Sequence, residues 1–269
     1  MGYRFLVATD MDYTLLVTGM PISSENLRAV RAIHEAGGAL TLATGRSSFA
    51  SGTFARDLDI KVPLITSNGA SLFDPVARKE VYSSLMDQNT VKELSSFFIE
   101  KNTDATAYSP EGIFFLPGST RRPFFTKYNE NIPEDLKAPV FDFDINSHIP
   151  SVNKFLLISP DQETEAFLRS MEGLELVSSA YTYFDVMKEG NTKGKGLLML
   201  ADMLGIPKDM TFSLGDGEND LSMIKDAGYG IAMGNSDERL FTHAAYITSN
   251  CEDDGFAKAV FKFILPKVS

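Results

Sequence analysis

The sequence predicts an α/β fold in which a Rossmann-like parallel sheet is interrupted by an inserted α+β domain. Both ends of the chain alternate short apolar runs with amphipathic helical stretches, which is the pattern of parallel βαβ units with right-handed crossovers. The middle of the chain instead shows strands of alternating aromatic residues. The length of 269 residues is enough for about two domains of ordinary size.

The N-terminal part of the chain contains the first predicted βαβ unit. Residues 4–9 and residues 39–43 are apolar runs of the length expected for fully buried strands. Between them, Ser23 or Ser24 is placed to cap a helix. Residues 63–66 are predicted to form the next strand.

The C-terminal third repeats this order of elements. Its pattern predicts a helix over 193–204, a strand over 211–215, a helix over 219–226, a strand over 229–233 and a last helix over 254–264. Because the short buried strands at both ends have the same character, we expect them to share one sheet.

The middle of the chain is predicted to fold as a separate α+β domain. Alternating strands are expected over 112–116 and 153–158, among two or three helical stretches. We therefore predict a discontinuous core of residues 1–83 and 188–269, into which residues 84–187 are inserted.

Composition limits the classes of function. The chain has 36 acidic residues against 25 Lys and Arg, a net charge of −11, so its surface repels nucleic acid and anionic lipid. The single cysteine, Cys251, has no partner for a disulfide or a thiolate zinc site. We expect no export signal and no membrane helix. These features predict a cytoplasmic protein with no nucleic-acid or membrane partner, and no obligate protein partner is evident.

Carboxylates follow two predicted strands at the point where each strand ends. Asp10 and Asp12 come directly after the first strand, and Asp216 follows the strand over 211–215. An isolated Asp-x-Asp is commonly a turn or a helix cap. Here, however, ligands of a parallel sheet bind at the carboxyl ends of its strands, and clustered carboxylates there need a cation. Hard oxygen ligands with few protein carboxylates favour Mg²⁺.

Two further segments are suited to an anion. Thr44 and Gly45 precede a predicted helix, where a hydroxyl and free backbone N–H groups can bind a phosphate oxygen. Taken alone, the pair is more often an ordinary helix N-cap. Lys193 lies at a helix start, where the helix dipole does not favour a cation. This placement indicates a role toward an anion.

Two common nucleotide motifs are excluded. The segment around Gly194 and Lys195 lacks the spacing of a Walker A loop, and Gly215-x-Gly217 lacks the third glycine of a dinucleotide fingerprint. The three histidines, His34, His148 and His243, show no metal-ligand spacing.

The ordered motifs resemble the haloacid dehalogenase superfamily of phosphohydrolases, and within it the Cof-type branch with a large α+β cap. The resemblance covers about residues 1–82 and 188–269. It rests on four motifs in the family's order, namely Asp10-Met11-Asp12-Tyr13-Thr14, Thr44-Gly45-Arg46, Lys193-Gly194 and Gly215-Asp216-Gly217-Glu218-Asn219-Asp220. Ala232-Met233-Gly234-Asn235 and Ser67-Asn68-Gly69-Ala70 are further Cof-like phrases.

The resemblance implies the chemistry of the matching carboxylates. Asp10 would be the nucleophile that forms an aspartyl-phosphate, and Asp12 would be the general acid and base. Mg²⁺ would be held by Asp10, by Asp12 through its backbone carbonyl, and by Asp216, with Asp220 as support from nearby.

The resemblance also implies how the phosphoryl group is bound. Its oxygens would be held by preorganised donors, which are the backbone N–H groups of Met11 and Gly45 and the side chains of Thr44, Lys193 and Asn219. Arg46 and Asn68 would lie on the substrate side. The inserted cap would select the leaving group.

The implied function is a Mg²⁺-dependent phosphatase of a small phosphorylated metabolite such as a sugar phosphate. A phosphomutase using the same aspartyl-phosphate is the alternative enzyme, and a non-catalytic phosphate-binding or phosphoacceptor regulatory protein is the alternative outside enzymes. One residue departs from the pattern, because the Cof-type branch usually has glycine where Tyr13 stands. Tyrosine disfavours a positive φ, so this residue bears on the shape of the loop and on the room above the nucleophile.

Overall fold

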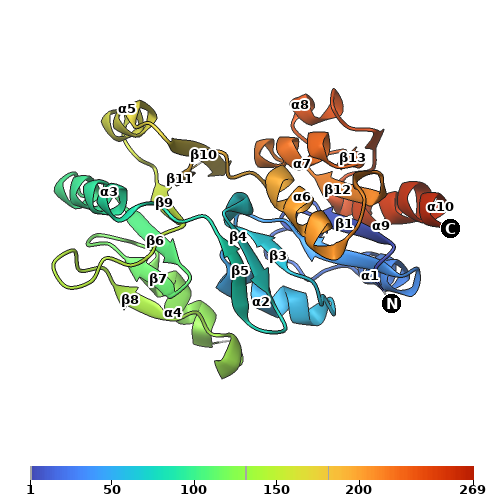
Figure 1. Ribbon diagram of the computed structural model, residues 1–269, viewed down its shortest axis with the longest axis horizontal. Helices are drawn as coiled ribbons and strands as arrows, with labels where there is room; N and C mark the ends of the chain where they lie inside the picture. Colours follow the sequence, from blue (N-terminus) through green and yellow to red (C-terminus); the bar gives the residue numbers. More distant parts are fainter. Residues whose placement is uncertain (1, 131, 181) are drawn as a thin grey trace. The chain divides into compact units, whose positions relative to one another are not determined.

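The computed structural model describes residues 2–130, 132–180 and 182–269. The chain forms two compact units (Figure 1). One comprises Met1–Arg46, Phe54–Val81 and Thr192–Ser269, and the other comprises Ser47–Thr53 and Tyr82–Asn191. Among the helices of the described residues, none has the length and apolar character needed to cross a bilayer.

The first unit is built on a parallel five-stranded sheet, which confirms the predicted α/β fold. The strand order is β14-β13-β12-β1-β2, and every neighbouring pair is parallel. The strands are β1 (Phe5–Thr9), β2 (Gly38–Leu42), β12 (Thr211–Gly215), β13 (Tyr229–Ala232) and β14 (Tyr246–Ile247). Strands from the two ends of the chain therefore share one sheet, as expected.

The strand order alone indicates where a ligand would bind in this unit. From β1 the chain moves to β2 on one side, and β12 lies on the other side. Ligands of parallel sheets bind at such a reversal of strand order, beyond the carboxyl ends of the strands. The residues that follow β1 and β12 meet at this position.

Helices pack beside the sheet in two pairs. Helix α1 (Ser24–Glu35) packs beside α9 (Gly255–Ala259), and α6 (Lys193–Leu204) packs beside α7 (Leu221–Asp226). The predicted cap of α1 is confirmed, because the Ser23 side chain accepts a hydrogen bond from the N–H of Asn26. Gly205 ends α6 in the left-handed conformation that favours glycine.

The C-terminal helix is less regular than the period of its apolar residues predicts. After α9 the chain adopts a π-helical turn over Val260–Ile264 and then continues as α10 (Leu265–Val268). The predicted helix over 219–226 likewise begins with a 3₁₀ turn, Glu218–Asp220, before α7.

Helices α8 (Glu238–Phe241) and α2 (Ser48–Asp57) lie outside these pairs. Helix α8 follows β13 in the first unit. Helix α2 follows β2, and the division between the two units falls within it, after Thr53.

A small sheet extends the first unit. It consists of β3 (Leu64–Thr66), β4 (Ser71–Asp74) and β5 (Lys79–Ser83). A parallel bridge between Ala43 and Ile65 joins the end of β2 to β3. The strand predicted over 63–66 is confirmed as β3, whereas β4 and β5 were not predicted from the sequence.

The second unit is an α+β structure. Its six-stranded sheet has the order β10-β11-β9-β6-β7-β8, and all neighbours are antiparallel except β7 and β8. An apolar core joins Val91, Leu94 and Phe98 of α3 to the inner side chains of the strands. The elements are α3 (Gln88–Glu100), β6 (Ala105–Ser109), β7 (Gly112–Phe115), α4 (Arg122–Glu130), β8 (Val140–Asp142), β9 (Lys154–Ile158), α5 (Gln162–Ser170), β10 (Leu174–Ala180) and β11 (Tyr183–Lys188).

Candidate active site

Two carboxylates lie at the carboxyl edge of the parallel sheet. Asp10 follows β1 and Asp216 follows β12, and Thr9 is in register with Leu214 on the neighbouring strand. The N–H of Asp10 donates to the carbonyl of Leu214 at 2.9 Å. The ladder therefore continues into the loop and holds the two aspartates at the same edge, where the sequence predicted a site.

Lys193 connects this edge to a third carboxylate. It is the first residue of α6, and its Nζ donates to Asp10 Oδ1 at 2.8 Å and to Asp220 Oδ1 at 2.6 Å. The Lys193 side chain is 0% exposed and that of Asp10 is 13% exposed. The sequence indicated that this lysine faces an anion, and in the structure that anion is a pair of aspartates.

The acidic groups carry more negative charge than Lys193 balances. Asp10, Asp216 and Asp220 each offer a carboxylate oxygen, and these atoms lie within 4.8 Å of one another. Burial, opposed by Lys193 and reinforced by the neighbouring carboxylates, raises the pKa of Asp10 to about 8. Burial and Asp220 raise the pKa of Asp216 to about 7, against a hydrogen bond from Thr14. Both carboxyl groups therefore take up protons near neutral pH. A bound cation would offset the repulsion between the carboxylates that favours their protonated forms.

Asp220 differs from the other two in how it is used. Its Oδ2 accepts the backbone N–H groups of Asp216 and Gly217, each at 2.9 Å, and its Oδ1 accepts Lys193. Asp220 thus holds the loop after β12 in shape. Lys193 binds Asp10 through Oδ1, and Thr14 binds Asp216 through Oδ1, so the Oδ2 atoms are the ones that these two bonds leave for a metal ion.

The donor set fits a hard divalent cation. Carboxylate oxygens from Asp10 and Asp216 with no nitrogen or sulfur ligand are what Mg²⁺ takes in proteins, with water completing its coordination. Of the four predicted metal residues, the cluster brings together Asp10, Asp216 and Asp220. The Asp12 side chain lies outside the cluster, which is compatible with the implied use of its backbone carbonyl.

Asp12 is instead held by Arg46. The guanidinium donates through Nε to Asp12 Oδ2 at 2.9 Å and through Nη2 to Oδ1 at 2.6 Å. Thr18 Oγ1 also donates to Oδ1 at 2.6 Å. The Asp12 and Arg46 side chains are 31% and 30% exposed, so this pair is open to solvent on one side. Arg46, predicted on the substrate side, contacts Asp12 in the structure.

The predicted phosphate-binding residues form a connected set of loops. Thr44 donates its N–H to Ile65 and accepts, on its hydroxyl, the N–H of Arg46 at 3.1 Å. Asn68 donates its N–H to the Thr44 carbonyl at 3.0 Å, and its Oδ1 accepts Asn219 Nδ2 at 3.0 Å. The structure therefore places Thr44, Asn68 and Asn219 together, and Asn68 acts there as a contact of Asn219.

Met11 and Gly45 complete the predicted set. Met11 is fully buried, and its carbonyl accepts the N–H groups of Thr14, Leu15 and Leu16. These bonds fold the segment after Asp10 into a tight turn. Gly45 lies close to Asn68, because a Cβ added at Gly45 would be 3.1 Å from Asn68 Oδ1.

Two residues with no role predicted from the sequence lie at the site in the structure. Thr14 Oγ1 donates to Asp216 Oδ1 at 2.6 Å, joining the loops after β1 and β12. Asn235 Nδ2 donates to the Tyr13 carbonyl at 2.9 Å. Both residues lie inside motifs that resemble the family, and this was the available signal, but no chemical pattern identified their partners.

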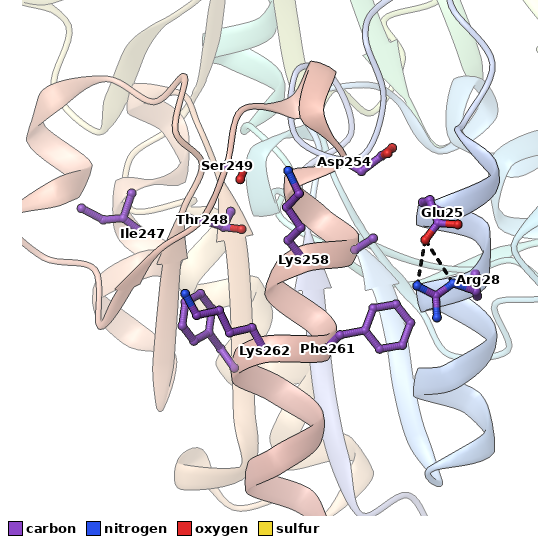
Figure 2. A pocket seen from close by; sticks show the side chains of 11 residues that line it. Glu25, Arg28, Ile247, Thr248, Ser249, Asp254, Lys258, Phe261 and Lys262 are labelled. Atoms are coloured by element: carbon purple, nitrogen blue, oxygen red, sulfur yellow. Dashed lines mark hydrogen bonds and ion pairs between the residues drawn. The ribbon is translucent and has the colours of Figure 1, made fainter.

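A cavity of about 630 Å³ lies elsewhere in the first unit (Figure 2). Figure 2 shows Glu25 and Arg28 on one side and Lys258, Phe261 and Lys262 on the helix beside them. Arg28 donates to Glu25 and lies 4.1 Å above the Phe261 ring. None of the clustered carboxylates lines this cavity, so its size does not make it the active site.

Comparison with known proteins gives a family match over most of the chain. The family model described as haloacid dehalogenase-like hydrolase matches residues 7–260. A 5-amino-6-(5-phospho-D-ribitylamino)uracil phosphatase of Bacillus subtilis is 30% identical over 266 residues, covering 97% of this chain and 96% of the relative. A pyridoxal phosphate phosphatase of Escherichia coli is 25% identical, covering 97% of this chain and 98% of the relative.

Solved structures show the same architecture. A sugar phosphatase described as subclass IIB of the haloacid dehalogenase superfamily has a TM-score of 0.79 and 26% sequence identity, and the match covers 97% of this chain and 99% of that one. The full lengths of the chains therefore correspond, including the inserted segment.

Proposed function

This chain belongs to the haloacid dehalogenase-like hydrolases and is a phosphoric monoester hydrolase of their Cof-type branch. From this premise we propose that it is a Mg²⁺-dependent phosphatase of a small sugar phosphate. We propose further that it acts through an aspartyl-phosphate on Asp10. The observation that carries the proposal is the position of Asp10 at the end of β1, fixed by Lys193 and facing Asp216 with one carboxylate oxygen available.

The names of the similar proteins support the substrate class. The phosphatases named above act on a phosphorylated ribityl chain, on pyridoxal phosphate and on a sugar phosphate. Each of these is a small phosphate ester of an alcohol, and two carry the phosphate on a sugar or sugar-derived chain. An alcohol leaving group needs a proton as its bond to phosphorus breaks, which requires a general acid.

In the first half of the proposed reaction, a carboxylate oxygen of Asp10 attacks phosphorus. The bond between phosphorus and the ester oxygen breaks, and Asp12 gives its proton to the leaving alcohol. In the structure both Asp12 oxygens accept hydrogen bonds from Arg46. The pair with Arg46 must therefore loosen before Asp12 can face the leaving oxygen.

In the second half, water attacks the phosphorus of the aspartyl-phosphate. Asp12 takes a proton from that water, the bond between Asp10 and phosphorus breaks, and inorganic phosphate leaves with the Asp10 carboxylate restored. Lys193 holds Asp10 from one side throughout. The donors proposed for the other phosphoryl oxygens are Thr44, Asn219 and the N–H groups of Met11 and Gly45.

Asp10 and Asp216, with the Asp12 carbonyl, are the proposed holders of Mg²⁺. When bound, the ion would offset the repulsion between the Asp10 carboxylate and the anionic phosphate and stabilise charge on the transferring group. Asp220 would support this set through its contacts with Lys193 and with the loop after β12.

The experiment is a phosphate-release assay with Asp10→Asn and a matched aspartate control. The substrates are hexose and pentose phosphates, pyridoxal phosphate and an aryl phosphate, each with Mg²⁺ or with chelator. Asp202→Asn serves as the control, because Asp202 is exposed on α6, the helix that carries Lys193. We expect Mg²⁺-dependent release by the wild type and the control, and none by Asp10→Asn.

Two results would contradict this proposal. Equal release by Asp10→Asn and the wild type would exclude Asp10 as nucleophile. Transfer of the phosphoryl group to another hydroxyl of the substrate, with no inorganic phosphate released, would identify a phosphomutase.

A further inference from the structure

Tyr13, in the loop after β1, has a strained backbone conformation. Tyr13 has φ of 60°, in the left-handed region. This region is uncommon for a bulky residue and persists only where the surroundings impose it. Tyr13 is 52% exposed, so the protein covers only part of this residue.

Two hydrogen bonds fix the Tyr13 backbone. Its N–H donates to the Leu16 carbonyl at 2.7 Å, within the same turn. Its carbonyl accepts Nδ2 of Asn235 at 2.9 Å, from a segment 222 residues away. The first bond belongs to the turn itself, whereas the second ties the turn to another part of the unit.

The Asn235 amide is oriented by its other end. Asn235 Oδ1 accepts the backbone N–H of Cys251 at 2.8 Å. Because a backbone N–H can only donate, it requires the oxygen of the amide, and the amide nitrogen must then face the Tyr13 carbonyl. The amide is thus a two-sided clamp between the loop after β1 and the segment at Cys251.

The segment that carries Asn235 is itself hydrogen-bonded to the end of β12, next to Asp216. The N–H of Met233 and the hydroxyl of Ser236 both donate to the Gly215 carbonyl, at 3.1 Å each. The N–H of Asp237 donates to the Asp216 carbonyl at 2.8 Å. Asn235 therefore sets the loop after β1 relative to the strand end that presents Asp216.

The Tyr13 backbone in turn determines where Asp12 lies. The peptide unit between the two residues contains the Asp12 carbonyl, a proposed metal ligand, and a change of φ at Tyr13 would alter the path of the chain at Asp12. We infer that Asn235 is a positioning residue that holds Tyr13 in its left-handed conformation and thereby fixes Asp12 at the active site. This inference rests on the proposed function for its catalytic consequence.

The test is a double-mutant cycle between positions 235 and 13. Asn235→Ala removes the clamp, and we expect kcat for phosphate release to fall about 10- to 100-fold with KM changed by less than about threefold, because small displacements of a catalytic group have effects of this size. In the Tyr13→Gly background, glycine adopts positive φ without strain. There we expect Asn235→Ala to lower kcat by less than about threefold, because two residues that act through one contact are not additive.

A control and a conservative variant define the specificity of the effect. Glu238→Ala, at an exposed position three residues after Asn235, should leave kcat unchanged. Asn235→Asp keeps the acceptor for Cys251 but presents a carboxylate oxygen to the Tyr13 carbonyl, so it should be as impaired as Asn235→Ala. A merely structural role for Asn235 would lower kcat equally with Tyr13 present and in the Tyr13→Gly background, and that result would overturn the inference.

A second measurement does not depend on activity. Hydrogen exchange of a peptide covering residues 11–18 should be about tenfold faster in Asn235→Ala than in the wild type, because local opening becomes easier, while a peptide from α3 is unchanged. If the wild type releases no phosphate, the proposed function fails, but faster exchange of residues 11–18 would still support the clamp. Unchanged exchange in Asn235→Ala would overturn it.

Discussion

Lys193 shows at the scale of one residue how the site depends on charge balance. It is fully buried between Asp10 and Asp220. Burial opposes its charge, but the two carboxylates outweigh burial and raise the pKa of Lys193 above its usual value. Lysine therefore stays charged at neutral pH, and its removal would leave two buried carboxylates facing each other without a counter-charge.

We predict that Lys193→Met lowers the free energy of unfolding by about 3 kcal/mol at about pH 8, the usual cost of leaving a buried charge unpaired. The loss should be smaller at about pH 5, where Asp10, whose pKa is raised to about 8, is protonated and carries no charge. Urea denaturation followed by circular dichroism measures both values. Lys195→Met is the matched control, since Lys195 is exposed in the same helical turn, and its effect should be below about 0.5 kcal/mol. Equal losses for the two variants would show that Lys193 carries no special charge role.

The start of α6 depends on a close approach to the turn after β3. Gly69 has φ of 90°, and a Cβ added there would lie 2.1 Å from the Thr192 carbonyl oxygen and 3.2 Å from the Lys193 nitrogen. Both are backbone atoms, so α6 would have to move. Gly205, at the other end of the same helix, also has positive φ, 67°, but a Cβ there would meet nothing within 4 Å.

This contrast predicts different outcomes for two similar substitutions. Gly69→Ala should displace Lys193 and lower phosphate release by about tenfold or more, in addition to destabilising the fold. Gly205→Ala carries only the backbone strain, about 1 kcal/mol, and should keep full kcat. Parallel kinetics and thermal denaturation test the pair. Normal kcat in Gly69→Ala would mean that the contact with Thr192 does not set the position of Lys193.

The sheet of the second unit contains a buried ion pair between neighbouring strands. Lys154 of β9 donates to Asp185 of β11 at 2.7 Å, and their side chains are 4% and 1% exposed. Lys154→Met alone should cost about 3 to 5 kcal/mol, because Asp185 would stay buried without its counter-charge. The double variant with Asp185→Val should be more stable than Lys154→Met.

A surface pair provides the comparison for that prediction. Lys101 and Glu163 are 2.6 Å apart, with side chains 32% and 68% exposed, so Lys101→Met should cost far less than Lys154→Met. Chemical denaturation of the three variants is the measurement. A double variant less stable than Lys154→Met would show that the charge of Asp185 is stabilised by other groups.

At the scale of elements, the sequence predicts what depends on local pattern. The strands β1, β2 and β12 are apolar runs with clear ends, and α1 and α6 carry their caps in the sequence. The π-helical turn over Val260–Ile264 is different, because its apolar residues have the spacing of an ordinary helix. The turns of this segment are wider than those of an ordinary helix, which the spacing of its apolar residues does not indicate.

For the whole molecule, strand order explains why much of the site could be predicted. Residues at the ends of parallel strands must meet at one edge, so Asp10 and Asp216 were expected together although they are far apart in the sequence. Side-chain pairing could not be predicted in the same way. Lys193 binds aspartates, and Arg46 binds Asp12. These pairings depend on loop shape and rotamers, which the residue types alone do not determine.

The acidic cluster also gives the whole protein a predicted dependence on pH. The pKa of Asp216 is raised to about 7 and that of Asp10 to about 8, so the folded protein binds more protons than the unfolded chain between about pH 4 and about pH 8. Without a cation, stability is therefore greatest near the low end of this range and decreases as pH rises through the two raised pKa values. The pKa of Asp237 is lowered to about 2, so this residue changes the stability of the protein only at lower pH.

Mg²⁺ should reverse this trend, since a cation bound by Asp10 and Asp216 requires their unprotonated forms. We predict that Tm in chelator falls between about pH 5.5 and about pH 8.5, a range that brackets both pKa values, and that the gain in Tm on adding Mg²⁺ increases over the same range. Asp216→Asn should remove most of the gain, whereas Asp202→Asn should keep it. A gain that is independent of pH would show that Mg²⁺ binds elsewhere, because only a site formed by these two carboxylates couples metal binding to the release of their protons.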